Sequence, residues 1–176
     1  MQENEKQREE EQRKSSIRQA LQERRRNVLI HGAEDPGTWE TKEESLKHAQ
    51  KILQDVLEIE NGIVIEDCHR LPQNPALKQG KMLRDRTLKK TRPIIIKVKD
   101  YFMVTNIWKN VSKLKEHNKE AEENGGNKIS ISRHLPRELQ QEREKLVPDM
   151  IKARKKGKQA RIKYNDETVH MYLDID

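Results

Sequence analysis

The chain has 176 residues, enough for one ordinary domain or two small ones and too few for a large enzyme. Charged residues make up 38% of it, apolar residues 32% and aromatic residues 3%, so part of the chain cannot belong to a packed core. The formal net charge of +7 favours a polyanion as partner, either nucleic acid or an anionic membrane surface.

Cysteine content and the apolar runs exclude several protein classes. The single cysteine, Cys68, excludes an internal disulfide framework and a multi-cysteine zinc site. The first residues are polar, unlike a secretory signal, and the longest apolar runs, 28–30 and 94–96, are far too short to span a membrane. We therefore expect a soluble intracellular protein without a membrane partner.

Positive charge is concentrated in two segments. Residues 152–163 contain seven cations and no acid, residues 78–92 contain seven cations and one acid, and the remainder of the chain is net negative. One such run alone would favour a solvated lysine-rich face. Two dense runs on an otherwise acidic chain are typical of a phosphate-binding surface.

Residues 1–24 are almost wholly polar and are predicted to form a solvated helix or the end of a coiled coil. The only helix-spaced apolar set is Ile17, Ala20 and Leu21, and no heptad pattern is sustained. A lone helix that buries so little is marginal in water.

The next segment is predicted as strand, helix, strand, strand, helix, strand. The strands are expected at residues 27–32, 63–71, 92–99 and 128–132. A capping box at Thr41 and Glu44 opens the first helix, which Asn61–Gly62 is expected to end, and Asp100 caps the second. Residues 73–91 and 118–128 are predicted as polar loops.

This order is the split βαβ plan of the α+β class, a four-stranded antiparallel sheet with two helices on one face. The RNA-recognition motif binds RNA on the open face of such a sheet, where bases stack on aromatic side chains. The corresponding first and third strands offer Leu29 or Val28, and Pro93, Ile95 and Lys97. We therefore predict an atypical RNA-recognition motif with weak base stacking and poor sequence readout on this face.

A small α+β domain is predicted to follow. Its helix should kink or split at Pro148 and end at Gly157, and residues 160–164 and 169–175 should pair as a hairpin. The predicted apolar face of the helix consists of Leu139, Leu146, Val147, Met150 and Ile151. Tyr164 is assigned with equal weight to the hairpin core or to an exposed stacking position. Trp108 is predicted to be core, and Trp39 has no predicted role.

Catalytic motifs are missing from the sequence, which has no Gly-rich phosphate loop, HExxH, CxxC or serine elbow. The six histidines lie in separate predicted elements without metal-ligand spacing. Cys68 and His69 are neighbours in a predicted strand and should point to opposite faces, so they do not form a nucleophile and base. We predict neither an enzyme nor a metal or cofactor.

Five short motifs, taken together, resemble the first-open-reading-frame protein of LINE-type (non-LTR) retrotransposons over residues 24–176. They are Arg25–Gly32 (RRNVLIHG), Cys68–Leu71 (CHRL), Arg92–Lys97 (RPIIIK), Arg143–Leu146 (REKL) and Ala153–Gly157 (ARKKG). In that family a coiled coil precedes an atypical RNA-recognition motif and a small C-terminal domain. The protein trimerises through the coiled coil, coats the element's RNA and acts as a nucleic-acid chaperone.

The resemblance implies a division into residues 1–24, 25–133 and 134–176, with RNA bound in a cleft between the last two. It also implies that RNA contacts Arg143 on the C-terminal helix, Arg161 and Tyr164 on the next strand, and Arg70 and Arg92 at strand ends. Residues 1–24 lack a long heptad array, so the expected homo-oligomer is a trimer if an upstream coiled coil exists. The implied location is cytoplasmic ribonucleoprotein granules, with some nuclear entry.

Our leading hypothesis is a sequence-tolerant protein that binds single-stranded RNA and DNA, acts as a nucleic-acid chaperone and packages retrotransposon RNA into a ribonucleoprotein. Neutralising about eight phosphates would give a slope of log affinity against log salt of about −6. The predicted nucleic-acid-binding residues are Arg70, Arg92, Arg133, Arg143, Arg154, Lys155, Lys156, Arg161, Lys163 and Tyr164. The alternative is a non-enzymatic coiled-coil scaffold whose basic runs serve solubility or nuclear import.

Overall fold

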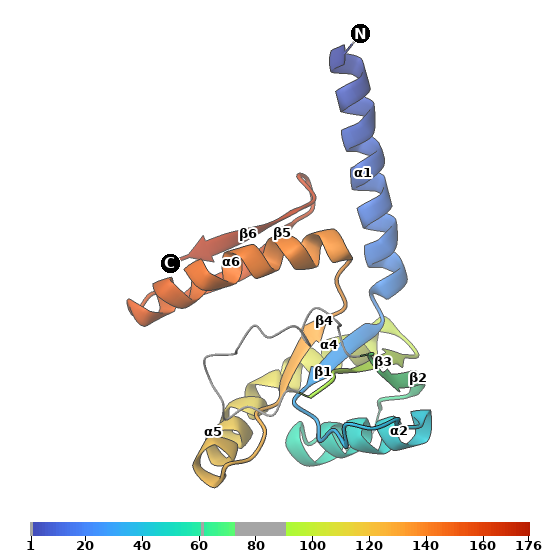
Figure 1. Ribbon diagram of the computed structural model, residues 1–176, viewed down its shortest axis with the longest axis vertical. Coiled ribbons are helices and arrows are strands. Elements are labelled where there is room, and N and C mark those ends of the chain that lie inside the picture. Colours follow the sequence, from blue (N-terminus) through green and yellow to red (C-terminus); the bar gives the residue numbers. More distant parts are fainter. Residues whose placement is uncertain (1, 61, 73–90) are drawn as a thin grey trace. The chain divides into compact units, whose positions relative to one another are not determined.

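A computed structural model describes residues 2–60, 62–72 and 91–176 (Figure 1). The chain forms two compact units. The sheet unit is Arg25–His134, and the hairpin unit combines Met1–Arg24 with Leu135–Asp176. The predicted division gave residues 1–24 a segment of their own, whereas the structure groups them with the C-terminal elements. Within the described ranges, no helix is long and apolar enough to cross a membrane.

The sheet unit contains a four-stranded antiparallel sheet in the order β2-β3-β1-β4. Its strands are β1 (Asn27–His31), β2 (Ile65–Arg70), β3 (Ile94–Val98) and β4 (Ser130–Arg133). Its helices are α2 (Lys42–Lys51) with the π-helical turn η1 (Ile52–Val56), and α4 (Tyr101–Asn110) with the 3-10 turn η2 (Val111–Lys113) and α5 (Leu114–Asn124). The α+β fold class is confirmed, and the arrangement is compatible with an RNA-recognition-motif-like fold.

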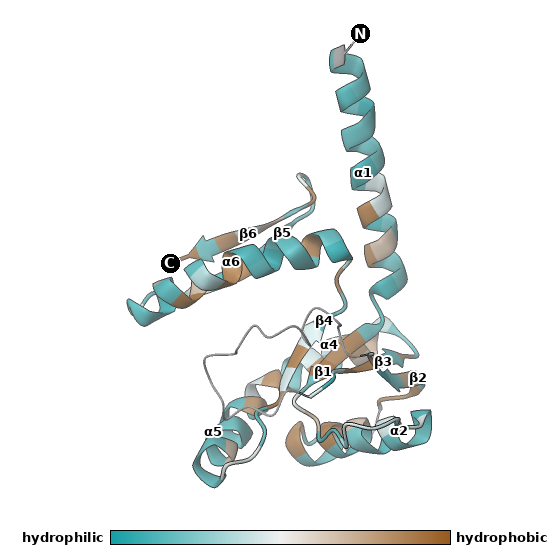
Figure 2. Cartoon of the chain, in the orientation of Figure 1, coloured by the Kyte–Doolittle hydropathy of each residue, from teal (hydrophilic) through white to brown (hydrophobic). Residues whose placement is uncertain are grey.

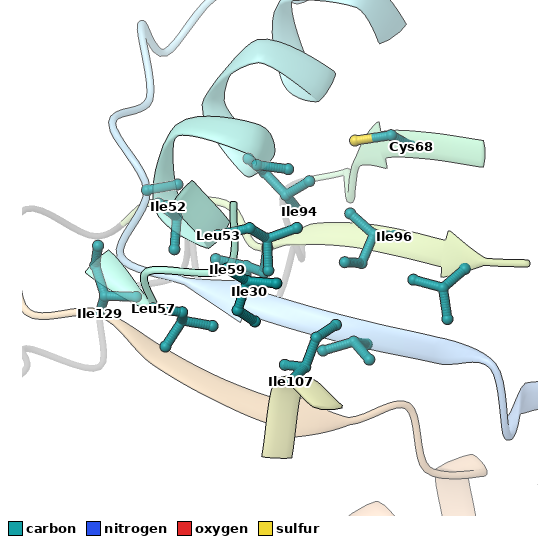
Figure 3. Close-up of a cluster of buried hydrophobic side chains, with 14 of the residues drawn as sticks. Ile30, Ile52, Leu53, Leu57, Ile59, Cys68, Ile94, Ile96, Ile107 and Ile129 are labelled. Carbon is teal, nitrogen blue, oxygen red and sulfur yellow. The ribbon is translucent and has the colours of Figure 1, made fainter. Parts of the chain in front are cut away.

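The core of this unit lies between one face of the sheet and the helices. Alternation along β1 and β3 turns Val28, Ile30, Ile94 and Ile96 toward the helices, where all four are buried. The same cluster includes Ala49, Ile52, Leu53 and Leu57 from the first helical segment, and Val104 and Ile107 from α4. Figure 3 shows these side chains converging from strands and helices. Both helices therefore cover one face, as predicted.

The start of α2 confirms the predicted capping box. Thr41 Oγ1 accepts a hydrogen bond from the Glu44 amide at 3.1 Å, and the Glu44 carboxylate accepts one from the Thr41 amide at 2.8 Å. The helical turns end at Val56, earlier than the predicted Asn61–Gly62. Glu58 takes a left-handed φ of 53° and redirects the chain.

The loop predicted at residues 118–128 is largely wrong, because α5 continues to Asn124. Polar composition suggested a loop, but Glu, Lys and Ala are strong helix formers. Leu114 and Ala121, seven residues apart, supply the buried side of this helix. Gly125 ends it with a left-handed φ of 71°.

The hairpin unit contains α1 (Gln2–Arg24), α6 (Arg137–Lys155), β5 (Ala160–Asn165) and β6 (His170–Ile175). Figure 2 shows α1 as mostly hydrophilic, with a few hydrophobic positions in its C-terminal half. One of these, Ile17, is 3% exposed and packs with Leu139 and Val169. Arg18 also donates to the Asp166 carbonyl at 2.8 Å. The helix predicted to be solvated therefore docks on its own unit.

Helix α6 packs against both strands of the hairpin. It runs through Pro148 as one element, so of the two predicted outcomes, a kink or a split, the split does not occur. Pro148 and Glu144, whose carbonyl loses a hydrogen bond to the proline, are both exposed, so water can satisfy that carbonyl. Leu139 is buried as predicted, but Ile151 is exposed because the packed face follows the spacing of Leu139, Leu146, Met150 and Ala153.

Candidate nucleic-acid interface

The outer face of the β5–β6 hairpin carries two of the predicted contact residues. Arg161 and Lys163 alternate along β5 with Ala160, Ile162 and Tyr164, so the two cations share the face that points away from α6. Both are exposed. Across the ladder, Lys163 stands directly opposite Tyr172, which is 41% exposed. This face therefore presents two cations and one aromatic ring, together with the Asp174 carboxylate opposite Arg161.

Tyr164 lies on the inner face of the hairpin. It packs against the cluster of Ile17, Leu139 and Val169, and burial raises the pKa of its phenol. Its ring is therefore part of the core of the hairpin unit and does not lie beside Lys163. The exposed-stacking interpretation of Tyr164 is not supported, and Tyr172 is the aromatic residue on the cationic face.

The basic run predicted from residues 152–163 begins at the C-terminal end of α6 and continues through the turn into β5. Arg154 Nε donates to the Ala160 carbonyl at 3.0 Å, which ties the helix end to the first residue of β5. Four exposed cations in this run form no ion pair with any described residue. They are Lys155, Lys156, Lys158 and Arg161.

These cations also have a structural role that must be separated from binding. Positive charge in the last turn of a helix interacts favourably with the helix dipole and contributes about 0.3–1 kcal/mol. Lys155 and Lys156 lie at this position. That interaction does not use the hydrogen-bonding capacity of the ammonium groups, which remain open to phosphate oxygens.

Arg143 and Lys163 are less available to a phosphate than the four exposed cations described above. Arg143 is half-buried in the middle of α6, about 16 Å along the helix from Arg154 at a rise of 1.5 Å per residue. Lys163 Nζ lies 2.5 Å from the Asp174 carboxylate, and this hydrogen bond raises the pKa of Lys163. A phosphate bound at Lys163 must compete with that carboxylate.

Arg70 was predicted to contact nucleic acid, but the structure assigns it another role. Its side chain and that of Glu40 are each 2% exposed, and the two form an ion pair. Arg70 also donates to the Glu34 carbonyl at 2.6 Å and the Arg92 carbonyl at 2.7 Å. Within the described ranges the contacts of Arg70 are internal, so Arg70 is a structural residue and not a phosphate contact.

Arg92 is held in a similar way. Its side chain and amide donate three hydrogen bonds to the Asp35 carboxylate at 2.8–2.9 Å, and its guanidinium donates to the Thr38 carbonyl at 2.6 Å. Arg92 is therefore also a structural residue. The other cations of the 78–92 run lie outside the described residues.

Arg133 is exposed, but it shares the helix-covered side of the sheet with its cross-strand partner Val28. Its guanidinium lies over the ring of Trp108 at 5.9 Å from the centroid. Trp108 is partly buried against the core, so the prediction that it packs there is confirmed.

The open face of the sheet has the composition predicted for it. Leu29 lies between Ile95 and Ser132 in the ladder, and His69 is the other neighbour of Ile95. None of the four described strands contains Phe, Trp or Tyr. Apart from the imidazole ring of His69, the residues named here are aliphatic or small and polar, so the candidate interface is better placed on the hairpin unit.

Other chemistry finds little support in the described ranges. Cys68 is buried, and burial raises the pKa of its thiol to about 12, so the reactive thiolate is not formed near neutral pH. Groups of His, Cys, Asp or Glu arranged to hold a metal ion are missing from the described part of the chain.

Sequence reasoning missed two residues of this interface. Lys158 belongs to the basic run but is not among the predicted contacts. Its position in that run, next to Gly157, already indicated an exposed side chain. Tyr172 was overlooked because Tyr164 is adjacent to Lys163 in sequence. The period of two in a strand already places Lys163 and Tyr164 on opposite faces, so it could have identified the error.

Comparison with known proteins gives no family assignment: no family model and no curated protein matches this chain.

Proposed function

We propose that this chain binds single-stranded RNA and DNA through the basic end of its hairpin unit, with little dependence on sequence. The observation that carries the proposal is a set of exposed cations that form no ion pair with any described residue, on the same unit as the exposed ring of Tyr172. These cations are Lys155, Lys156, Lys158 and Arg161. Cations supply sequence-independent attraction to phosphates, and an aromatic face supplies sequence-tolerant stacking.

The same features support nucleic-acid chaperone activity. Many weak phosphate contacts reduce repulsion between strands while each contact remains exchangeable. Arg161 and Lys163 lie exposed on one strand face, which favours a surface over which strands can exchange. By the LINE-type resemblance, the RNA would be that of a retrotransposon, packaged by a homo-oligomer of the protein.

The first test is binding to labelled single-stranded RNA by fluorescence anisotropy, with duplex DNA of equal length for comparison. The test variant changes Lys155, Lys156 and Lys158 to Gln, which keeps a helix-forming side chain and removes the charges. The control variant makes the same change at Lys109, Lys115 and Lys119, three exposed lysines of the sheet unit. Loss in the test variant with retention in the control supports the proposal.

Chaperone activity requires a separate assay. Annealing and strand exchange of complementary labelled oligonucleotides should accelerate with the wild-type chain and the control variant, and much less with the test variant. Equal loss in both triple variants would mean that only net charge matters, and the assignment to the hairpin unit would be wrong.

A further inference from the structure

The loop between β1 and α2, residues 34–40, is held by two of the arginines that were first expected to bind nucleic acid. Arg92 binds the Asp35 carboxylate and the Thr38 carbonyl, and Arg70 binds the Glu34 carbonyl and the Glu40 carboxylate. The Gly37 amide adds a hydrogen bond to Asp35 at 2.9 Å. Within the described residues, the backbone is therefore fixed at both ends and in the middle of this loop.

Trp39 lies inside this fixed loop, yet its side chain is 82% exposed. The residue before it is held through its carbonyl by Arg92, and the residue after it is held through its carboxylate by Arg70. A single exposed apolar residue is ordinary on a protein surface. Here, however, the residue before Trp39 is held by a hydrogen bond to its carbonyl and the residue after it by an ion pair of its carboxylate, rather than by burial of the indole. The ring is therefore presented to solvent from a constrained loop.

The charged side chains near the loop bear on whether this part of the surface favours a phosphate group. A hollow of about 1060 Å³ is lined in part by Glu34, Asp35 and Gly37 of this loop, whereas Trp39 is not among its lining residues. It is lined by three cations and three acids, Lys47, Lys51, Arg92, Glu34, Asp35 and Asp55. This balance does not select a phosphate group. The indole face itself is uncharged and favours a planar ring, which it binds by stacking.

We propose that Trp39 is a nucleobase-stacking residue of the sheet unit, which takes an unpaired base of the single-stranded nucleic acid bound by this chain. This inference rests on the proposed function and adds a second contact type at a separate position. Because the loop is already ordered, little conformational entropy is lost when a base stacks on it. One base on an aromatic side chain changes affinity by roughly 5- to 150-fold on alanine substitution.

The lack of Phe, Trp and Tyr in the sheet strands makes this contact informative. In an ordinary RNA-recognition motif the bases stack on strand residues, whereas here the strands offer Leu29, Ile95 and the imidazole ring of His69. An exposed indole in the loop after β1 gives the sheet unit a larger aromatic stacking surface than its strands provide.

The test compares oligo(dT) with an abasic oligomer of equal length, which keeps the phosphates and removes the bases. The variants are Trp39→Ala and Trp39→Phe, and circular dichroism and urea unfolding confirm that each folds. Trp39→Ala should weaken oligo(dT) binding by roughly 5- to 150-fold and leave abasic binding unchanged. Trp39→Phe should retain most of the affinity.

Fluorescence supplies a second readout. Trp39 and Trp108 are the only tryptophans in the sequence, so a Trp108→Phe background isolates the emission of Trp39. Stacking should quench that emission with oligo(dT) but not with the abasic oligomer.

Unchanged affinity of Trp39→Ala for oligo(dT), while the wild type binds tightly, would overturn this inference alone and would leave the ring for another partner such as a peptide. Equal loss for both oligomers would also overturn it, since bases would not be the ligand. Failure of the wild type to bind either oligomer at low salt would remove the proposed function itself.

Discussion

Lys163 and Tyr172 are cross-strand partners on the outer face of the β5–β6 hairpin, whereas Tyr164, the next residue after Lys163, points into the core of the hairpin unit. One exposed aromatic ring therefore lies beside a cation, and one partly buried ring packs against the core of the hairpin unit. The two tyrosines should respond oppositely to substitution.

Tyr172→Ala should weaken single-stranded RNA binding by roughly 5- to 150-fold with little change in the free energy of unfolding. Tyr164→Ala should instead lower the free energy of unfolding by about 2 kcal/mol, less than the value for a fully buried aromatic ring. Anisotropy and urea unfolding measure the two effects. Tyr172→Phe serves as the control that keeps the stacking face. The reverse pattern would show that the faces are assigned wrongly.

Two lysines of the basic run should contribute differently to RNA binding, because one forms an ion pair within the protein. Lys163 is paired with Asp174, whereas Lys156 has no ion-pair partner among the described residues. We expect Lys156→Gln to reduce the salt slope of RNA binding by about 0.7, and Lys163→Gln to reduce it by much less. Asp174→Asn should strengthen binding, because it releases the Lys163 ammonium. Equal effects of the two lysine substitutions would contradict this ranking.

Arg70 should matter for stability and not for binding. Arg70→Met leaves the buried Glu40 carboxylate with His48, at 3.3 Å, in place of an arginine partner, and should lower the free energy of unfolding by up to about 3–5 kcal/mol. The double variant Arg70→Met/Glu40→Leu should recover most of that loss, since neither charge remains buried. Urea unfolding measures both. Should Arg70→Met keep full stability and lose RNA affinity, Arg70 would be a phosphate contact after all.

The ion pair of Asp35 with Arg92 should stabilise the fold to an extent that depends on pH. Hydrogen bonds from Arg92 hold the pKa of Asp35 well below its ordinary value. A carboxyl whose pKa is lower in the folded state stabilises fully above its unfolded pKa, about 3.9, and the effect is lost as pH falls further. The free energy of unfolding should therefore fall more steeply below about pH 4 for the wild type than for Asp35→Asn. Parallel curves would show that the ion pair contributes nothing.

The fold of the sheet unit was largely predictable, because its signals are local. Alternation in 94–98, the capping box at Thr41 and Glu44, and helical spacing from Ala49 to Leu57 each indicate one element without reference to the rest of the chain. Helix α5 was missed because few apolar residues mark its buried side, although its propensity was high.

The site was less predictable, because it depends on contacts between residues far apart in sequence. From the sequence alone, Arg70 is a plausible phosphate contact, because nothing near it in the chain shows its partner. The structure places Glu40, thirty residues earlier, beside it. The docking of α1 is of the same kind: Ile17 meets Leu139 and Val169 from the other end of the chain. The basic run after residue 152 was predictable, because unpaired cations at the end of a helix need no distant partner.

The central claim is that the end of the hairpin unit binds phosphates, and the salt dependence of single-stranded RNA binding tests it most directly. The measurement compares the wild type with the Gln variant of Lys155, Lys156 and Lys158, and with the control variant of Lys109, Lys115 and Lys119. Removing three phosphate contacts should make the slope of log affinity against log salt shallower by about 2, with little change in the control. The same slope in all three proteins would contradict the account.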